Sequence, residues 1–245
     1  MLVDIWTVIW KEWREILHQR GSIRATVLNQ LLLVVIFAVS FSLKAGHGWL
    51  ETAESLQIWY LLPMLLVMTA IPDSFAGERE RHTLETLLAS RLSEPAIMLG
   101  KIGAAVSYAC GLALVAGLLS MAIINITHWD GTVHFYSLGV FLGGIGTSLL
   151  IATLVASLGV FVSLRAATVR QAQQSLGLGI FVLAVVPLIV SFLLPKAWKA
   201  SLAQSLNAAS STQVVLIAVL LLVGLDVILI VAAIRRFKRT QLMLD

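Results

Sequence analysis

Charged residues are scarce in this chain. Asp, Glu, Lys and Arg make up 12% of its 245 residues, hydrophobic residues make up 59%, and the mean hydropathy is +0.94. Soluble globular domains carry about 25% charged residues, so this chain has too little polar surface to cover itself in water. The composition excludes an ordinary soluble domain and predicts an integral membrane protein.

The chain also lacks the residue patterns of several kinds of site. It has one cysteine, Cys110, which excludes an intrachain disulfide. It has no Gly-x-x-x-x-Gly-Lys-Ser/Thr loop, so we expect no ATP binding through a P-loop and no cofactor in this chain. Four residues with metal-binding side chains, His47, His128, Asp130 and His134, have spacings that match no zinc pattern, so no metal site is predicted.

Long apolar runs are the dominant feature that is present. Six of them approach or exceed the 20 or so helical residues that cross a hydrocarbon layer, and none alternates in polarity as a barrel strand would. The sequence therefore predicts an all-α, polytopic membrane protein with six transmembrane helices. The runs cover residues 25–43, 58–76, 102–127, 138–164, 176–194 and 214–234.

The basic residues predict the orientation of these spans. Fourteen of the 17 Lys and Arg residues lie in the N-terminal segment, the second loop, the fourth loop and the C-terminal tail. Because cytoplasmic flanks of spanning helices keep an excess of positive charge, both termini are predicted to be cytoplasmic. The same dispersal argues against nucleic acid as a partner, which would require one basic patch.

The first 24 residues form a separate predicted segment, followed by a permease domain over 25–245. Trp6, Trp10, Trp13 and Leu17 recur at helical spacing, with charged residues mainly on other faces. Tryptophan favours the headgroup region, so we expect an amphipathic helix on the inner leaflet that turns into the first span at 21–22. A helix packed under the bundle is the alternative.

The second cytoplasmic loop is predicted to hold a short helix between two spans. Gly77 is expected to break the second span, and Thr83 is a plausible N-cap for the short helix. Ser93 or Glu94 would cap the next helix, with Pro95 in its permissive first turn. The short helix carries an apolar stripe, Leu84, Leu87 and Leu88, and paired charges, Glu78, Arg79, Glu80, Arg81, Glu85 and Arg91.

This stripe is too short to span a membrane and needs a partner surface. A soluble protein fits it, because paired charges fix the register of a docked helix. An interfacial helix lying on lipid fits the pattern equally well on physical grounds alone.

Residues 77–88, Gly-Glu-Arg-Glu-Arg-His-Thr-Leu-Glu-Thr-Leu-Leu, followed by Ser-Glu-Pro-Ala-Ile-Met-Leu-Gly-Lys at 93–101, resemble permeases of ATP-binding-cassette exporters of the second export class. The resemblance implies a coupling helix seated on a separate ATPase subunit that binds ATP and Mg²⁺. It also implies a second permease chain, identical or paralogous, and a bacterial or archaeal cytoplasmic membrane. His82 departs from the family, which often has glycine there. The implied coupling residues are Glu78, Glu80, Arg81, Leu84, Glu85, Leu87, Leu88 and Arg91.

Two other functions compete with export. An intramembrane enzyme needs paired catalytic groups, but the spans hold one clear central acid, Asp226, so no catalytic residue is predicted. An ATP-independent secondary transporter would more often show an internal repeat with broken helices. Asp226 itself lies about 12 Å from the cytoplasmic end of its span at 1.5 Å per residue. It is either functional or a protonated group bonded to a neighbouring helix.

Two packing expectations complete the analysis. Asp73, at the inner end of the second span, is expected to pair with Arg79 or with the N-terminal basic turn. Gly139 and Gly143, followed by further small residues, predict close helix packing within the bundle or across a dimer.

Overall fold

The computed structural model describes residues 1–18, 23–43, 46–83, 91–193 and 211–236. The described chain is helical and contains no strand. Its α-helices are α1 (Leu2–His18), α2 (Ile23–Ser42), α3 (Leu56–Glu80), α5 (Glu94–Thr127), α6 (Leu138–Ser163), α7 (Val169–Leu193) and α9 (Ser211–Arg236). Two short 3₁₀ helices, η1 (His47–Glu51) and η2 (Ala53–Ser55), lead into α3.

Each predicted span coincides with one of these helices, within a few residues at most ends. By length and composition, four helical segments of the described chain can cross a membrane: Ala53–Glu80, Glu94–Thr127, Leu138–Ser163 and Val215–Arg235. The apolar part of α2, Leu28–Ser42, is shorter than these four segments. The all-helical membrane fold is therefore confirmed, and the count of six spans stays a prediction.

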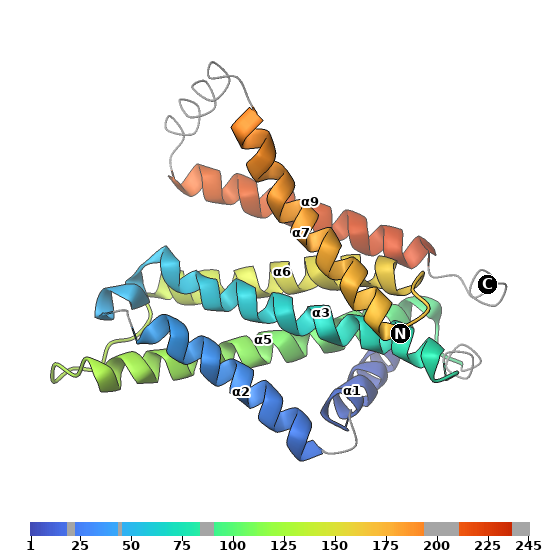
Figure 1. The fold of residues 1–245 in the computed structure, drawn as a ribbon, viewed down its shortest axis with the longest axis horizontal. Helices are drawn as coiled ribbons and strands as arrows, with labels where there is room; N and C mark the ends of the chain where they lie inside the picture. Colours follow the sequence, from blue (N-terminus) through green and yellow to red (C-terminus); the bar gives the residue numbers. More distant parts are fainter. Residues whose placement is uncertain (19–22, 44–45, 84–90, 194–210, 237–245) are drawn as a thin grey trace.

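Helix α3 lies at the centre of the molecule, between α5 and α6 and beside α2 (Figure 1). Its inward face is apolar from Ile58 to Ile71 and fully buried at Ile58, Leu62, Val67 and Ile71. These side chains pack against apolar residues of α5 and α6 in one continuous core. Pro63 and Pro72 lie inside α3, where neighbouring helices can compensate for the lost backbone bonds.

Small residues allow α3 to approach α5 and α6 closely, as predicted, although through a different pair of positions. A Cβ atom on Gly144 of α6 or on Gly117 of α5 would lie 2.6 Å from the Trp59 ring. Ser148, one turn beyond Gly144, donates a hydrogen bond to the Trp59 carbonyl oxygen. In contrast, a Cβ atom on Gly139 would contact nothing within 4 Å in the described chain. The close contact is thus built on Gly144-x-x-x-Ser148, within the bundle.

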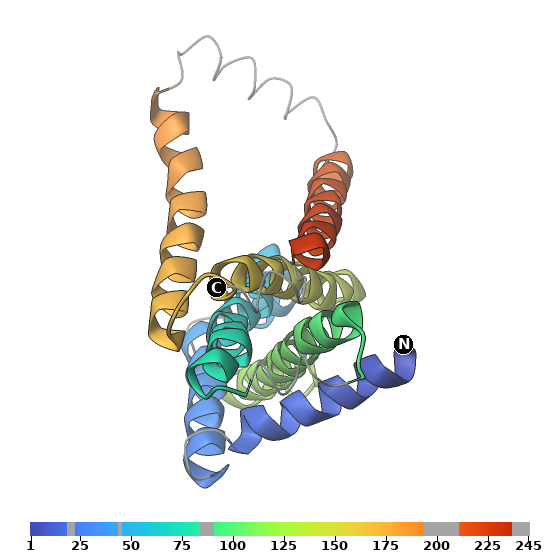
Figure 2. The same ribbon diagram turned by 90° about the vertical axis from the view of Figure 1, so that its right-hand side faces the viewer.

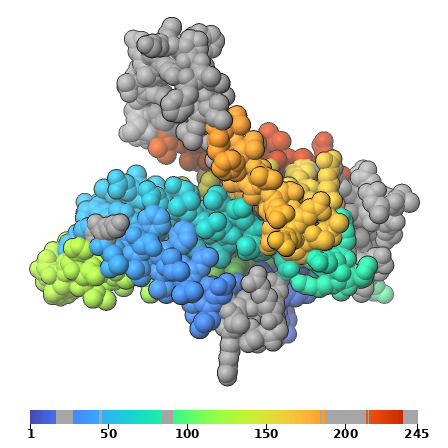
Figure 3. All heavy atoms as spheres, in the orientation of Figure 1, coloured from blue at the N-terminus to red at the C-terminus, as the bar shows by residue number. Residues whose placement is uncertain are grey.

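Helices α7 and α9 lean away from the rest of the bundle on the side of α6 (Figures 1 and 2). The outer face of α7 forms part of the molecular surface in the space-filling view (Figure 3). Leucine, isoleucine and valine side chains of α9 are exposed over most of its circumference. Apolar surface of this extent is typical of helices that face lipid or another membrane subunit.

The N-terminal segment forms helix α1, and this helix packs against the first half of α5. Val8 is buried, and a Cβ atom on Gly100 of α5 would lie 2.5 Å from the Val8 Cβ atom. Trp13 donates its indole N–H to the Ala104 carbonyl oxygen at 3.1 Å. Trp6 and Trp10 remain exposed on the opposite face. The alternative of a helix packed on the bundle is therefore observed, while the exposed tryptophans keep a surface suited to headgroups.

Helix α3 does not end at Gly77, so the predicted break there is wrong. The helix continues one further turn to Glu80 with Gly77 buried inside it. A Cβ atom on Gly77 would meet the Asp73 Oδ1 atom at 3.0 Å, so glycine here serves close packing rather than a turn. The extra turn carries Glu78 and Arg79 into contacts with other helices, which favours the longer helix.

Candidate functional site

The segment between α3 and α5 is the predicted coupling loop, and only its two ends are described. Leu84, Glu85, Leu87 and Leu88 lie outside the described residues, so the predicted short helix and its apolar stripe remain predictions. We call the end of the bundle where residues 81–93 connect α3 to α5 the junction end. It includes α1 and the beginning of α7 (Figure 1).

His82 ends α3 in the left-handed conformation, with φ of 57°. Its N–H bonds to the Arg79 carbonyl oxygen at 3.0 Å, and the Thr83 N–H bonds to the Glu78 carbonyl oxygen at 2.9 Å. These two bonds form a Schellman motif, whose left-handed position is usually glycine. Thr83 thus contributes to the end of α3. Its predicted role as N-cap of the next helix depends on residues 84–90, which lie outside the described residues, and stays a prediction.

The side chains of Arg79 and Glu80, within the motif, connect α3 to the loop between α6 and α7. The Arg79 guanidinium donates to the carbonyl oxygens of Leu164 at 2.8 Å and Ala166 at 3.1 Å. The Glu80 carboxylate accepts the Val169 N–H at the beginning of α7 at 3.3 Å. A cation at the C-terminal end of one helix and an anion at the N-terminal end of the next both complement the helix dipoles.

Asp73 is bound to Arg81, which was not among its predicted partners. Its Oδ1 atom accepts a hydrogen bond from Arg81 at 3.1 Å. The guanidinium of Arg79 is instead bound to carbonyl oxygens near the end of α6. The N-terminal basic turn at 19–22 lies outside the described residues.

Glu78 lies in a buried ion-pair network rather than on the surface of the loop. Its side chain belongs to a residue only 4% exposed, and its Oε1 atom lies 2.8 Å from Lys11 Nζ and 3.0 Å from Lys101 Nζ. Lys101, 1% exposed, also lies 2.8 Å from Glu12 Oε1. Two cations therefore face the two buried carboxylates where α1, α3 and α5 meet, and Lys11 also pairs with the more exposed Glu15 at 3.1 Å.

Ser74 completes the network. Lys101 Nζ donates to the Ser74 carbonyl oxygen at 2.8 Å, and the Ser74 hydroxyl donates to Glu12 Oε2 at 2.7 Å. A buried charge pair is stable only when its remaining polar atoms are also satisfied. Ser74 supplies such bonds from α3 to Lys101 of α5 and Glu12 of α1. We call Lys11, Glu12, Ser74, Glu78 and Lys101 the junction network.

Charge within the junction network outweighs burial for both residues of α1. Burial by itself would raise the pKa of the Glu12 carboxyl, but the charge and hydrogen bond of Lys101, with Lys11 and Ser74, hold it below its usual 4.5. Burial likewise opposes the charged form of Lys11, but the Glu78 hydrogen bond and the neighbouring carboxylates raise its pKa above the usual value. Both groups are ionised at neutral pH.

Glu12 and Lys101 were not predicted as site residues. The available signal was their position: each interrupts an otherwise apolar helix face, Glu12 beside the tryptophans and Lys101 within an apolar helix of 34 residues. Neither position reveals a partner, since the residues lie 89 positions apart in the chain. Arg91, by contrast, is exposed at the far end of the loop, as expected for a contact residue.

A small polar cavity lies next to the junction network. It has a volume of about 150 Å³ and is lined by residues of α1, α2, α3, α5 and α7, among them Gln30, Thr69 and Asp73. Tyr108 donates a hydrogen bond to Gln30 across it. Polar groups of several helices thus meet within the bundle at this level.

Asp226 of α9 is buried, with 5% of its surface exposed, on a helix that is otherwise largely exposed. It therefore lies on the face of α9 that packs against α6. Its Oδ1 atom has no hydrogen-bond partner in the described chain. The alternative of a bond from this atom to a neighbouring helix is not seen there, so Asp226 remains a candidate polar group of the bundle interior.

Comparison with known proteins identifies the family of this chain. The family model of the ABC-2 type transporter matches residues 3–200, which contain α1 through α7 and the junction network. A search of curated proteins found no match. Because the matched region covers most of the chain, the protein belongs to the ABC-2 type transporter family and is a membrane permease component of a transporter.

Proposed function

We propose that this chain is the membrane-spanning permease subunit of an exporter driven by ATP, with six spans and both termini in the cytoplasm. A separate ATPase subunit, which binds ATP and Mg²⁺, docks on the segment from Glu78 to Arg91. The observation that carries the proposal is the match to the ABC-2 type transporter family over 3–200, which includes this segment. Glu78 serves the bundle side of the segment, because it is buried in the junction network.

The contacts at the junction end support a mechanical role for the segment. Glu78 is bound to α1 and α5, Arg79 to the loop after α6, and Glu80 to the beginning of α7. A force applied to residues 81–93 therefore acts on five helices at once. Ion pairs with buried carboxylates resist separation, so the motion of an ATPase would move the bundle as a body instead of bending the loop alone.

A second permease chain completes the proposed transporter. Six helices offer limited wall for a central pathway, and a pair of chains would enclose it between them. The exposed apolar surface of α7 and α9 supports contact with lipid and with such a chain. An apolar hollow of about 300 Å³ between α6, α7 and α9, lined by Phe161, Leu176 and Leu229 among others, opens on this side.

The test is co-purification with candidate ATPase subunits, followed by substitution of the leucine stripe. Leu84→Asp and Leu87→Asp place a charge on the proposed docking face, so complex formation and stimulation of ATP hydrolysis should both fall. Trp129→Asp is the matched control, because it removes an exposed apolar side chain at the opposite end of the bundle. Full complex formation and stimulation with both leucine variants would refute the docking proposal.

The same preparation separates the rival functions. Transport into vesicles that requires ATP and the partner subunit supports the exporter. Uptake without nucleotide would instead identify a secondary transporter. Hydrolysis by the purified chain alone would identify an intramembrane enzyme.

A further inference from the structure

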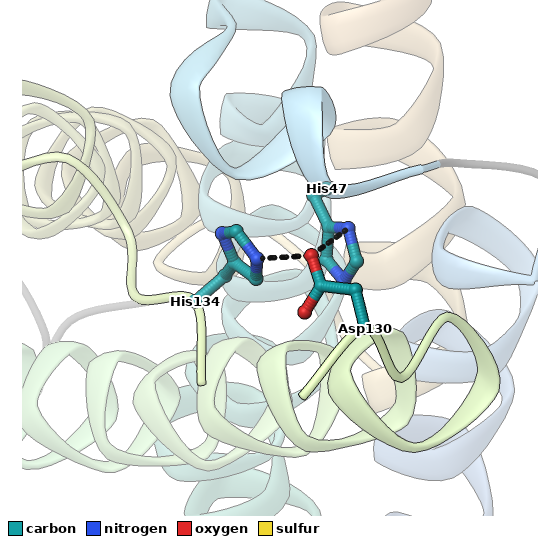
Figure 4. A group of neighbouring side chains, drawn as sticks. All are labelled: His47, Asp130 and His134. Atoms are coloured by element: carbon teal, nitrogen blue, oxygen red, sulfur yellow. Dashed lines mark hydrogen bonds and ion pairs between the residues drawn. The ribbon is translucent and has the colours of Figure 1, made fainter. Parts of the chain in front are cut away.

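Three residues with metal-binding side chains meet at the end of the bundle opposite the junction end. His47 belongs to η1, whereas Asp130 and His134 belong to the connection between α5 and α6 (Figure 4). One ligand atom of each lies within 4.8 Å of the others. Spacing along the sequence matched no zinc pattern, because the first residue is more than 80 positions from the other two.

We propose that His47, Asp130 and His134 bind a divalent transition-metal ion, Zn²⁺, which clasps η1 to the connection between α5 and α6. This site is independent of ATPase docking.

The distances suit a zinc ion. Asp130 Oδ2 lies 2.9 Å from His134 Nε2 and 3.8 Å from His47 Nδ1. Bonds of about 2.0–2.1 Å at tetrahedral angles place ligand atoms roughly 3.3 Å apart, so the two observed distances bracket the required value. Small movements of these partly exposed side chains bring all three ligand atoms into range. Three protein ligands leave the fourth position to water, as in open zinc sites.

The carboxylate is already oriented for this role by Thr132. The Asp130 Oδ1 atom accepts hydrogen bonds from the Thr132 N–H at 3.1 Å and from the Thr132 hydroxyl at 3.0 Å. This leaves the Asp130 Oδ2 atom facing the histidines. Outer hydrogen bonds that orient a metal ligand in this way are a general feature of metal sites.

Both sides of the site are fixed to the bundle. The buried Asn125 binds the backbone of His134 twice, accepting its N–H at 2.7 Å and donating to its carbonyl oxygen at 2.8 Å. On the other side, Leu50 follows His47 closely and is fully buried, and its carbonyl oxygen accepts the Ser137 N–H at 3.3 Å. The ligands are therefore held by the ends of packed helices.

A simple ion pair accounts for Asp130 and His134 but not for His47. The imidazole rings of His47 and His134 stack with their centroids 4.0 Å apart. The Nδ1 atom of His47 faces Asp130 Oδ2 at 3.8 Å, which is too long for a hydrogen bond. A bound cation explains why two histidines converge on one carboxylate, since neutral imidazole is a favoured ligand of Zn²⁺.

The experiment is titration of the purified, metal-stripped full chain with Zn²⁺, together with Co²⁺ as a spectroscopic probe. We expect one Zn²⁺ per chain, not displaced by Mg²⁺ or Ca²⁺, which prefer oxygen ligands. His47→Ala and His134→Ala should each weaken binding at least tenfold, and Thr132→Val, which affects only orientation, by roughly 10- to 100-fold. His82→Asn is the control, because it removes an exposed histidine at the junction end and should leave Zn²⁺ affinity unchanged.

A further variant distinguishes the loss of a metal ligand from the loss of the fold. His134→Cys keeps a metal ligand and should restore Co²⁺ binding, now with a thiolate-to-cobalt absorption band. Wild-type affinity in both alanine variants, or no Zn²⁺ binding by the wild-type chain, would overturn the proposal and leave an ion pair only. Neither result would affect the proposed coupling to an ATPase.

Discussion

Removal of the Lys101 charge tests the junction network directly. Lys101→Met keeps most of the side-chain length but leaves Glu12 and Glu78 facing each other, with Lys11 as the remaining cation of the network. Lys101 is only 1% exposed, so little solvent is available to screen the two carboxylates. Loss of one partner from a buried charge pair costs about 3–5 kcal/mol. For a chain of this size, that cost corresponds to a fall in melting temperature of roughly 6–20 °C.

A matched control and a compensating variant make the measurement specific. Arg170→Met also removes one positive charge at the junction end, but from an exposed side chain, and should change stability by no more than about 0.5 kcal/mol. Lys101→Met combined with Glu12→Gln removes one charge of each sign and leaves Lys11 paired with Glu78 and Glu15. The double variant should therefore lose less than the sum of the single losses, by roughly 0.5–3 kcal/mol.

The assay is thermal unfolding of the purified full chain in detergent, followed by the fluorescence of its seven tryptophans. Coincidence of the Lys101→Met and Arg170→Met transitions, within about 2 °C, would refute the reasoning. It would mean that Lys101 is solvated and that the network does not hold α1, α3 and α5 together. Strict additivity of Lys101→Met and Glu12→Gln would contradict the direct pairing.

Three further predictions concern stability at single positions. His82→Gly should raise the free energy of unfolding by about 0.5–1 kcal/mol, because glycine adopts φ of 57° without strain. His82→Val should lower it, because a β-branched residue is strained there. Equal melting temperatures of the two variants would contradict the left-handed conformation at position 82. Gly144→Ala should cost about 1–3 kcal/mol by overlap with the Trp59 ring, while the matched Gly146→Ala, where a Cβ atom meets nothing within 4 Å, should be neutral or stabilising. The pKa of Glu12 is lowered in the folded chain, so its contribution to stability is complete above about pH 4.5 and is lost as the pH falls below that value through the folded pKa. Thermal unfolding between pH 6 and 3 should therefore show a shallower acid loss in Glu12→Gln than in the wild type, and identical slopes would refute this assignment.

The helical membrane fold was predictable because it depends on local composition. In lipid, a continuous apolar run of spanning length can satisfy all of its backbone hydrogen bonds internally only as a helix. The observed helices accordingly coincide with the predicted runs. The resemblance of 77–101 to exporter permeases is likewise contained in a continuous stretch, and the family match over 3–200 confirms the family.

The ends of helices were less predictable, since they depend on contacts made elsewhere. Gly77 has the local character of a helix breaker, yet α3 continues because Glu78, Arg79 and Glu80 gain partners on other helices one turn further on. Position 82 holds histidine instead of the glycine that is usual at such a helix end, but His82 still adopts the left-handed conformation. Local propensity is a weak prior that such tertiary contacts override.

The sequence by itself determined that this chain is an all-helical membrane protein, since hydropathy and helix length are properties of contiguous residues. Only the tertiary structure decided which charges meet. Glu12 and Lys101 are paired across 89 positions, and His47 meets Asp130 and His134 from another connection. Ion pairs and metal sites depend on distances between helices, and the spacing of residues along the sequence does not reveal those distances.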